Sequence, residues 1–147
     1  MRSIFRKILV PYDFSRSAAE ALAVAVELAT KHGGGLMVMH AIPPHYPIHG
    51  RPVPPAAGEI AEVGGRLQEC VAAASKGRSV RRVKSWVVVG PPAASILEAA
   101  RKADAIVMGT LGRTGLPHLL LGSVAERIVR HAEVPVLTVR PRPRRRR

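Results

Sequence analysis

Cysteine, aromatic residues and acidic residues are all scarce in this chain of 147 residues. Cys70 is the single cysteine, so an internal disulfide is excluded and a reducing compartment, the cytoplasm, is expected. Aromatic residues make up 3% of the sequence and hydrophobic residues 47%, so the core must be built from aliphatic side chains. That composition favours helices packed on a parallel sheet, because the strands of such a sheet are buried on both faces.

Long hydrophobic runs are also missing. No apolar stretch approaches the roughly 20 residues of a membrane-spanning helix. The short apolar run near the N-terminus is broken by Asp13, and no signal peptide is expected. The length suits one domain, which we place at residues 1–141.

The shortage of acidic residues leaves a net charge of +13, and much of it lies in two places. Residues 140–147 hold six arginines, and residues 76–84 hold a second basic cluster. Like charges next to proline are typical of disorder, so residues 142–147 are predicted to form a disordered arginine-rich tail. This tail is a candidate for sequence-independent binding of nucleic acid or of an acidic partner.

Five short apolar runs rich in β-branched residues are predicted strands: residues 8–12, 36–42, 83–89, 105–108 and 136–139. The segments between them have helical spacing, most clearly residues 59–75, where apolar residues recur at steps of three and four. Alternating strands and helices predict an α/β fold, an open five-stranded parallel sheet with helices on both faces.

Several local signals mark where the helices begin and end. Ser17 with Glu20, and Ser123 with Glu126, have the spacing of a capping box. A Pro-Pro pair at residues 91–92 favours the start of a helix, and the three glycines at 33–35 favour a turn. Residues 43–58 hold six prolines and are predicted to form a poorly ordered flap over a ligand.

The loops that follow strands are the candidates for a ligand site, because ligands of such sheets bind at the carboxyl ends of the strands. The loop at residues 109–122 is rich in glycine and leads into a helix at Ser123, an arrangement that suits a phosphate group. An ordinary glycine-rich turn before a capped helix is the alternative. No P-loop and no dinucleotide-binding glycine motif is present in the sequence.

The spacing Gly109-x2-Gly112-x9-Gly122-Ser123 resembles the nucleotide motif of ATP-binding universal stress proteins. The opening segment Ile8-Leu-Val-Pro-Tyr-Asp-Phe-Ser15 resembles that family's first strand and its acidic residue. The resemblance runs from about residue 7 to residue 140. It implies an adenine nucleotide alpha hydrolase-like fold with strand order 3-2-1-4-5.

The resemblance also implies roles for individual residues. Pro11, Tyr12 and Asp13 would line the adenosine end, although Asp13 could equally satisfy backbone donors in its turn. Ile42 and Met108 would border the adenine. The ribose and phosphates would be held by a set drawn from the fourth-strand loop: Gly109, Gly112, Arg113, Gly122 and Ser123, with Val124 following on the helix.

The implied function is that of a dimeric, ATP-binding stress-response or signalling protein, paired through its last strand, with Mg²⁺ or Mn²⁺ on the phosphates. Two alternatives stay open: a family member that binds cyclic AMP, and a dimeric scaffold without nucleotide that acts through its basic tail. No carboxylate follows the fourth strand to serve as a base, so at most slow ATP hydrolysis is expected and no catalytic residue is assigned.

Overall fold

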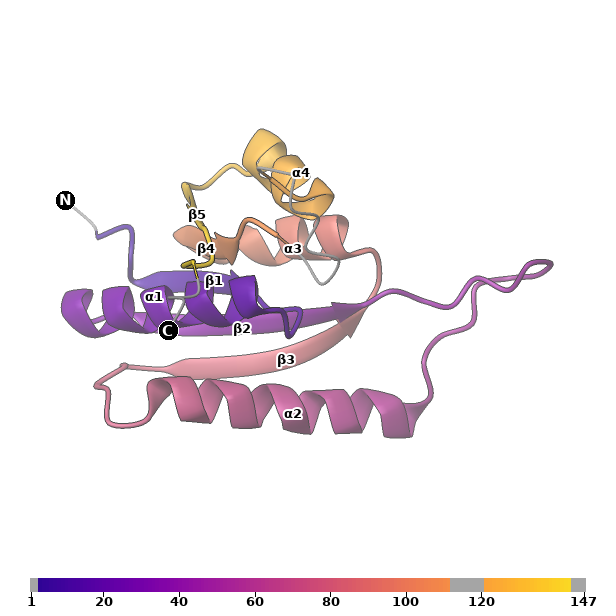
Figure 1. Ribbon diagram of the computed structural model, residues 1–147, viewed down its shortest axis with the longest axis horizontal. Coiled ribbons are helices and arrows are strands. Elements are labelled where there is room, and N and C mark those ends of the chain that lie inside the picture. Colours follow the sequence, from indigo (N-terminus) through magenta and orange to yellow (C-terminus); the bar gives the residue numbers. More distant parts are fainter. Residues whose placement is uncertain (1–2, 112–120, 144–147) are drawn as a thin grey trace.

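Five parallel strands form one sheet in the order β3-β2-β1-β4-β5, which confirms the predicted order (Figure 1). The computed structural model describes residues 3–111 and 121–143. Its strands are β1 (Lys7–Pro11), β2 (Gly35–Ile42), β3 (Val83–Val89), β4 (Ala105–Gly109) and β5 (Val136–Val139). Its helices are α1 (Arg16–His32), α2 (Ala57–Ser75), α3 (Pro92–Ala100) and α4 (Ser123–His131).

The sheet separates two cores, one under each pair of helices. Helices α1 and α2 pack on one face, and α3 and α4 pack on the other. Successive side chains of β1 alternate between the two cores, since Val10 belongs to the α1–α2 side and Leu9 to the α3–α4 side. Both residues are fully buried, as expected for a central strand of a parallel sheet.

Helix α2 confirms the apolar face that its spacing predicts. Leu67 and Val71 are buried against the sheet, while Ile60 and Val63 are half-buried. The helix begins at Ala57, two residues before the predicted start. Pro92 occupies the first turn of α3, in agreement with its fixed φ and missing N–H.

The predicted glycine turn between α1 and β2 is also confirmed. Gly33 ends α1 in the left-handed conformation, with φ of 64°. At Gly34 a Cβ atom would lie 1.8 Å from the carbonyl oxygen of Phe5, so only glycine fits between the turn and the segment before β1.

Both predicted capping boxes are wrong. Ser15, not Ser17, caps α1, because its Oγ accepts a hydrogen bond from the Ala18 N–H at 3.1 Å. Ser17 lies inside the helix and is buried. In α4 the N-cap residue is Gly122, and Ser123 is already the first helical residue, so neither serine stands where a box requires it.

Residues 43–56 form an arm that extends outward from the carboxyl edge of the sheet, and residues 57–58 of the predicted flap are the start of α2 (Figure 1). The flap prediction did not foresee any backbone pairing within this segment. His45 and Val53 form an antiparallel bridge with two backbone hydrogen bonds, at 2.9 and 2.8 Å. The arm presents exposed apolar side chains at Tyr46 and Ile48.

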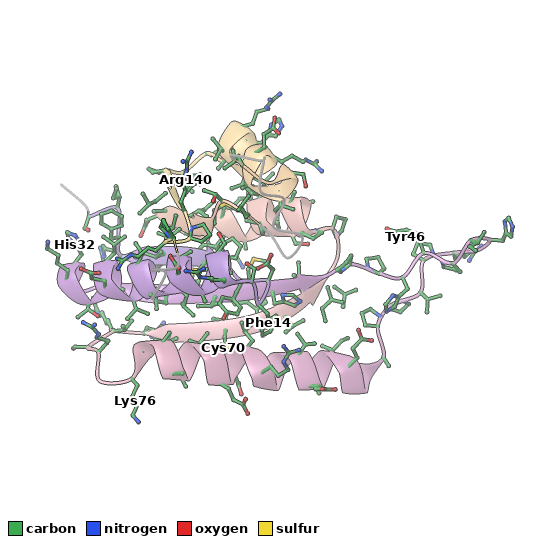
Figure 2. The ribbon with its side chains drawn as sticks, in the orientation of Figure 1. Phe14, His32, Tyr46, Cys70, Lys76 and Arg140 are labelled. Atoms are coloured by element: carbon green, nitrogen blue, oxygen red, sulfur yellow. The ribbon has the colours of Figure 1, made fainter. Side chains whose placement is uncertain are left out.

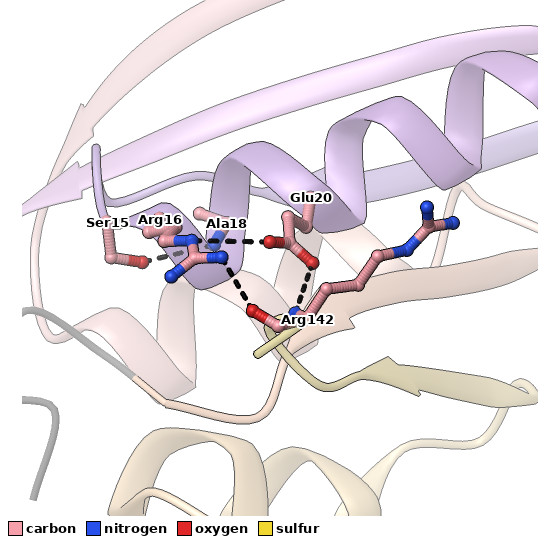
Figure 3. A network of polar contacts seen from close by, with 5 residues as sticks. All are labelled: Ser15, Arg16, Ala18, Glu20 and Arg142. Atoms are coloured by element: carbon pink, nitrogen blue, oxygen red, sulfur yellow. Dashed lines mark hydrogen bonds and ion pairs between the residues drawn. The ribbon is translucent and has the colours of Figure 1, made fainter. Parts of the chain in front are cut away.

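The first tail residue is held against the domain (Figure 3). The Arg142 N–H donates to Glu20 Oε2 at 2.8 Å, and Arg16 Nη2 donates to the Arg142 carbonyl at 2.6 Å. Arg16 and Glu20 also form an ion pair across one turn of α1. The docked part of the chain therefore reaches at least Arg142, one residue beyond the predicted domain boundary.

Candidate functional site

The sheet places the candidate site at the carboxyl ends of β1 and β4, where the strand order reverses. β1 pairs with β2 on one side and with β4 on the other. The connection after β1 runs to α1 on one face, and the connection after β4 runs to α4 on the opposite face. The helices that follow β1 and β4 therefore lie on opposite faces, and ligands of such sheets bind at this point of the sheet.

The turn after β1 is built around Asp13. Its Oδ1 accepts a hydrogen bond from the Ser15 N–H at 3.0 Å. Phe14, between them, has φ of 64°, a conformation that a bulky residue rarely adopts. Strained backbone of this kind persists where the surrounding structure holds it, often at a binding site. Asp13 thus has a structural role in the turn, whichever ligand contact it makes.

The Phe14 ring is held by aromatic and cationic neighbours. It makes edge contacts with Tyr12 and His40, at centroid distances of 5.2 and 5.0 Å. The Arg66 guanidinium lies 4.5 Å above the ring, a cation–π arrangement. His40 Nδ1 lies 2.7 Å from the Tyr12 carbonyl oxygen, which requires the proton on Nδ1. This hydrogen bond ties the buried His40 of β2 to the residue that follows β1.

Tyr12 is placed with its side chain in the core on the α1–α2 side of the sheet. It is 7% exposed. Burial, and then the neighbouring Cys70 side chain, raise the pKa of Tyr12 to about 12. The backbone of Tyr12 continues the sheet, since its N–H donates to the Met39 carbonyl at 2.8 Å. Because its side chain is buried in the core, Tyr12 takes part in the candidate site through its backbone.

At the end of β4, Gly109 lies against α1. A Cβ atom at this position would be 2.3 Å from Ser17 Oγ and 2.8 Å from the Ser17 carbonyl carbon. The Leu111 N–H donates to the same Ser17 Oγ at 3.3 Å. Gly109 is therefore required for the packing of β4 on α1, a role that the motif did not suggest. The sequence suggested a capping role for Ser17 and gave no sign of this contact with β4.

The beginning of α4 has no side-chain cap among the residues that the structure describes. The Gly122 N–H donates to the Thr110 carbonyl at 2.6 Å, and the Gly122 carbonyl accepts from the Glu126 N–H at 2.8 Å. The first helical N–H groups, including that of Ser123, follow directly. Such groups together with the helix dipole favour an anion. The negative charge of Glu126 in the first turn disfavours an anion there. This charge is partly balanced by Arg130, whose Nη2 lies 2.9 Å from Glu126 Oε1.

The other predicted site residues are distributed as follows. Met108 is buried in the α3–α4 core, and Val124 packs against that core. Ile42 is buried at the end of β2, where its carbonyl accepts from the Gly90 N–H at 2.9 Å. Pro11 ends β1 and is half-buried. Gly112 and Arg113 lie outside the described residues.

Within residues 3–111 and 121–143, no group of three or more histidine, cysteine or acidic side chains is arranged to hold a metal ion. The arm brings one such pair together, because His45 Nε2 lies 3.9 Å from Glu59 Oε2. In the same part of the chain, every helix is too short or too polar to cross a membrane.

A separate hollow of about 520 Å³ lies between the β2–β3 half of the sheet and α3. Met37, Trp86 and Val88 form its floor, and Lys84 stands over the Trp86 ring at 5.6 Å. None of the predicted site residues lines it.

The comparisons with known proteins agree with this architecture. The model of the universal stress protein family matches residues 4–140. A universal stress protein of Thermus aquaticus is 39% identical over 145 residues, covering 93% of this chain and 100% of the relative.

Two solved structures concern nucleotide complexes. One is a universal stress protein in complex with cAMP, with a TM-score of 0.69, 25% identity, and coverage of 95% of this chain and 100% of that one. The other is the universal stress protein of Archaeoglobus fulgidus in complex with dAMP, with a TM-score of 0.66, 26% identity, and coverage of 92% and 98%.

Proposed function

Because the chain belongs to the universal stress protein family, we propose that it is an adenine-nucleotide-binding protein of stress response or signalling. Two structural neighbours, one with cAMP and one with dAMP, support this ligand class. The proposal includes a cytoplasmic location, which rests on the cysteine content.

The observation that carries the proposal is at the N-terminus of α4, beside the end of β4, where no side chain of residues 3–111 or 121–143 caps the helix. A helix start without a side-chain cap leaves N–H donors for another partner. Ser123 does not cap this helix itself, because Gly122 is the N-cap residue and Ser123 is the first helical residue. A phosphate fits this position, because it would accept from the first N–H groups and interact favourably with the dipole.

Among adenine nucleotides we favour ATP, carrying Mg²⁺ or Mn²⁺ on its phosphates. The reason is the length of sequence between Gly109 and Ser123, which is sufficient to surround a triphosphate. Gly122 and Ser123 would hold the phosphates, and the segment from Pro11 to Asp13 would lie at the adenosine end. The metal ion would neutralise phosphate charge. No residue of this chain is assigned a catalytic role.

Replacing Gly122 by Val tests the site. Gly122 has φ of −68° and ψ of 161°, which valine also adopts, so the fold should survive. The valine side chain should keep a phosphate away from the helix start, and ATP affinity should fall at least about tenfold, or about 1.4 kcal/mol. Calorimetry measures the affinity, and mass spectrometry of ligand released from the purified protein identifies the native nucleotide.

Gly58→Val is the matched control, because a Cβ atom at Gly58 meets open space. Equal ATP affinity in the Gly122 variant and the wild type would overturn the site. Release of cyclic AMP would replace ATP with the first alternative. Absence of any bound or binding nucleotide would favour the scaffold.

We also propose a homodimer formed at β5. This strand is one of the two edges of the described sheet, and edges of this type pair readily with a second copy. Its exposed apolar side chain is Leu137, 43% exposed, whereas Val136 and Val139 pack inward on the two cores. A two-fold antiparallel contact would bury Leu137 against its own copy. Leu137→Lys should shift the mass measured by light scattering from that of a dimer to that of a monomer. A monomer of the wild-type protein at micromolar concentration would contradict the proposed dimer.

A further inference from the structure

The amino edge of the sheet, opposite the candidate site, joins segments that are far apart in the sequence. The Gly35 N–H donates to the Arg6 carbonyl at 2.9 Å, and the Arg81 N–H donates to the Gly34 carbonyl at 3.1 Å. The Leu36 N–H donates to the Arg82 carbonyl at 2.8 Å. These bonds fix the backbones of three segments side by side, so the side chains that they carry form one surface.

That surface is strongly positive. We define the basic edge as six exposed cations on the starts of β1 and β3 and the ends of α1 and α2: Arg6, Lys7, Lys31, Lys76, Arg81 and Arg82. Within the described residues none of the six forms an ion pair. Figure 2 shows Lys76 and His32 together at the end of the molecule remote from Tyr46 on the arm.

Helix dipoles explain only part of this charge. Lys31 and Lys76 lie at the C-terminal ends of α1 and α2, where a cation offsets the negative end of the dipole. Arg6, Lys7 and the Arg81-Arg82 pair precede or begin strands, where no helix dipole calls for them. The carboxylates of this edge, Asp104 and Glu133, belong to the connections before β4 and β5. The connection before β4 also carries Arg101 and Lys102, so that half of the edge mixes both signs, whereas the charged residues of segments 3–7 and 76–82 are all cations.

We propose that the basic edge binds the phosphate backbone of duplex nucleic acid without reading its sequence. Exposed lysine and arginine side chains on a fixed backbone provide the contacts that neutralise successive phosphates. Single strands would also need aromatic platforms for stacking, but the Phe5 ring of this edge is occupied by His32, at a centroid distance of 5.0 Å. A lipid surface is bound firmly when apolar side chains insert beside the cations, and the large apolar side chains exposed on the described part of these segments are limited to Ile4 and Val83.

The test compares two double variants of the full chain with equal loss of charge. Arg81→Gln with Arg82→Gln removes charge from the basic edge, and Arg51→Gln with Arg127→Gln removes it from exposed positions elsewhere. Binding of a fluorescent duplex is followed by anisotropy over a range of salt concentrations. The slope of log affinity against log salt should shrink by up to about 1.8 for the edge variant, roughly 0.9 for each phosphate that is no longer neutralised, and stay unchanged for the control.

Each other outcome overturns the proposal. Equal losses in the two variants would mean that net charge alone attracts the duplex. Loss of all duplex binding on deletion of residues 143–147, with no effect of the edge variant, would assign the binding to the tail. Binding to phosphatidylserine vesicles but not to the duplex would make the edge a membrane surface. ATP affinity, measured in parallel, should be unchanged in the edge variant, so the result is independent of the proposed nucleotide site.

Discussion

The two edges of the sheet are built on opposite principles. The amino edge uses close turns tied to one another by backbone bonds, such as residues 33–34 between α1 and β2. The carboxyl edge carries the long connections, residues 43–56 before α2 and residues 110–122 before α4. Helix N-termini face the carboxyl edge and helix C-termini the amino edge. The parallel topology thus separates an end suited to small anionic ligands from an end where cations gather.

The largest effect that this comparison predicts is at Gly34 on the amino edge. Gly34→Ala would place a Cβ atom 1.8 Å from the Phe5 carbonyl oxygen, and backbone must move to relieve the clash. We expect a loss of about 3 kcal/mol in the free energy of unfolding, at the upper end of what overpacking costs. Urea denaturation measures it.

Gly65→Ala is the control for this variant. Gly65 lies within α2 with open space around its Cβ position, so alanine should raise stability by up to about 1 kcal/mol through helix propensity. If the two variants were equally stable, the close packing of Gly34 against the Phe5 backbone would not limit which residue the turn accepts.

The second prediction concerns Tyr12 at the carboxyl edge and has a defined direction with pH. Its folded pKa of about 12 lies above the ordinary tyrosine value of 10.0, so the folded state keeps the proton longer than the unfolded state. The resulting stabilisation is complete below pH 10 and is lost as the pH rises towards 12. The loss should be on the order of 2 kcal/mol, and Tyr12→Phe should abolish it.

Denaturation in urea on either side of pH 10 measures this dependence. Tyr46→Phe is the control, because Tyr46 is 68% exposed on the arm and its removal should leave the alkaline loss in place. An alkaline loss that persists in Tyr12→Phe would assign the titration to another group.

The sequence predicted the fold more fully than the start of each helix. The bounds of β3 and β5 agree residue for residue, because arginine and glycine border the first run and proline and arginine border the second. The cap of α1 could not be chosen by spacing, since Ser15 and Ser17 both precede good helix formers. One local and one tertiary contact decide it: Asp13 fixes Ser15 in the turn two residues away, and Gly109 of β4 packs against Ser17.

The candidate site was predictable in its place but not in its details. Strand order and the carboxyl-end rule locate it between β1 and β4, and the structure confirms the strand order on which that location depends. The strained Phe14 could not be predicted, because a phenylalanine carries no signal for positive φ. The packing role of Gly109 also depends on a residue of another element, Ser17, which no motif includes.

The smallest predicted effect tests whether the tail begins as a fixed or a free segment. Glu20 joins α1 to the tail by accepting from the Arg142 N–H and pairing with Arg16. These interactions are partly exposed, so Glu20→Gln should cost only about 0.5 kcal/mol in global stability. The local effect should be clearer, because the Arg142 amide loses its charged acceptor and its hydrogen exchange should accelerate several-fold.

Glu27→Gln, an exposed carboxylate on the same helix, is the matched control and should leave exchange at Arg142 unchanged. The tail sequence alone predicts mobility from residue 142 onward, with ATP binding indifferent to it. The hydrogen bonds of the Arg142 backbone with Glu20 and Arg16 refine that prediction. Deleting residues 143–147 keeps these bonds and should leave ATP affinity within about twofold, a change of under about 0.5 kcal/mol. A larger loss of ATP affinity would mean that the arginines after Arg142 reach the phosphates from the N-terminal end of α1. The carboxyl edge would then bind phosphate with the charge of the tail, as we propose that the amino edge does with its own cations.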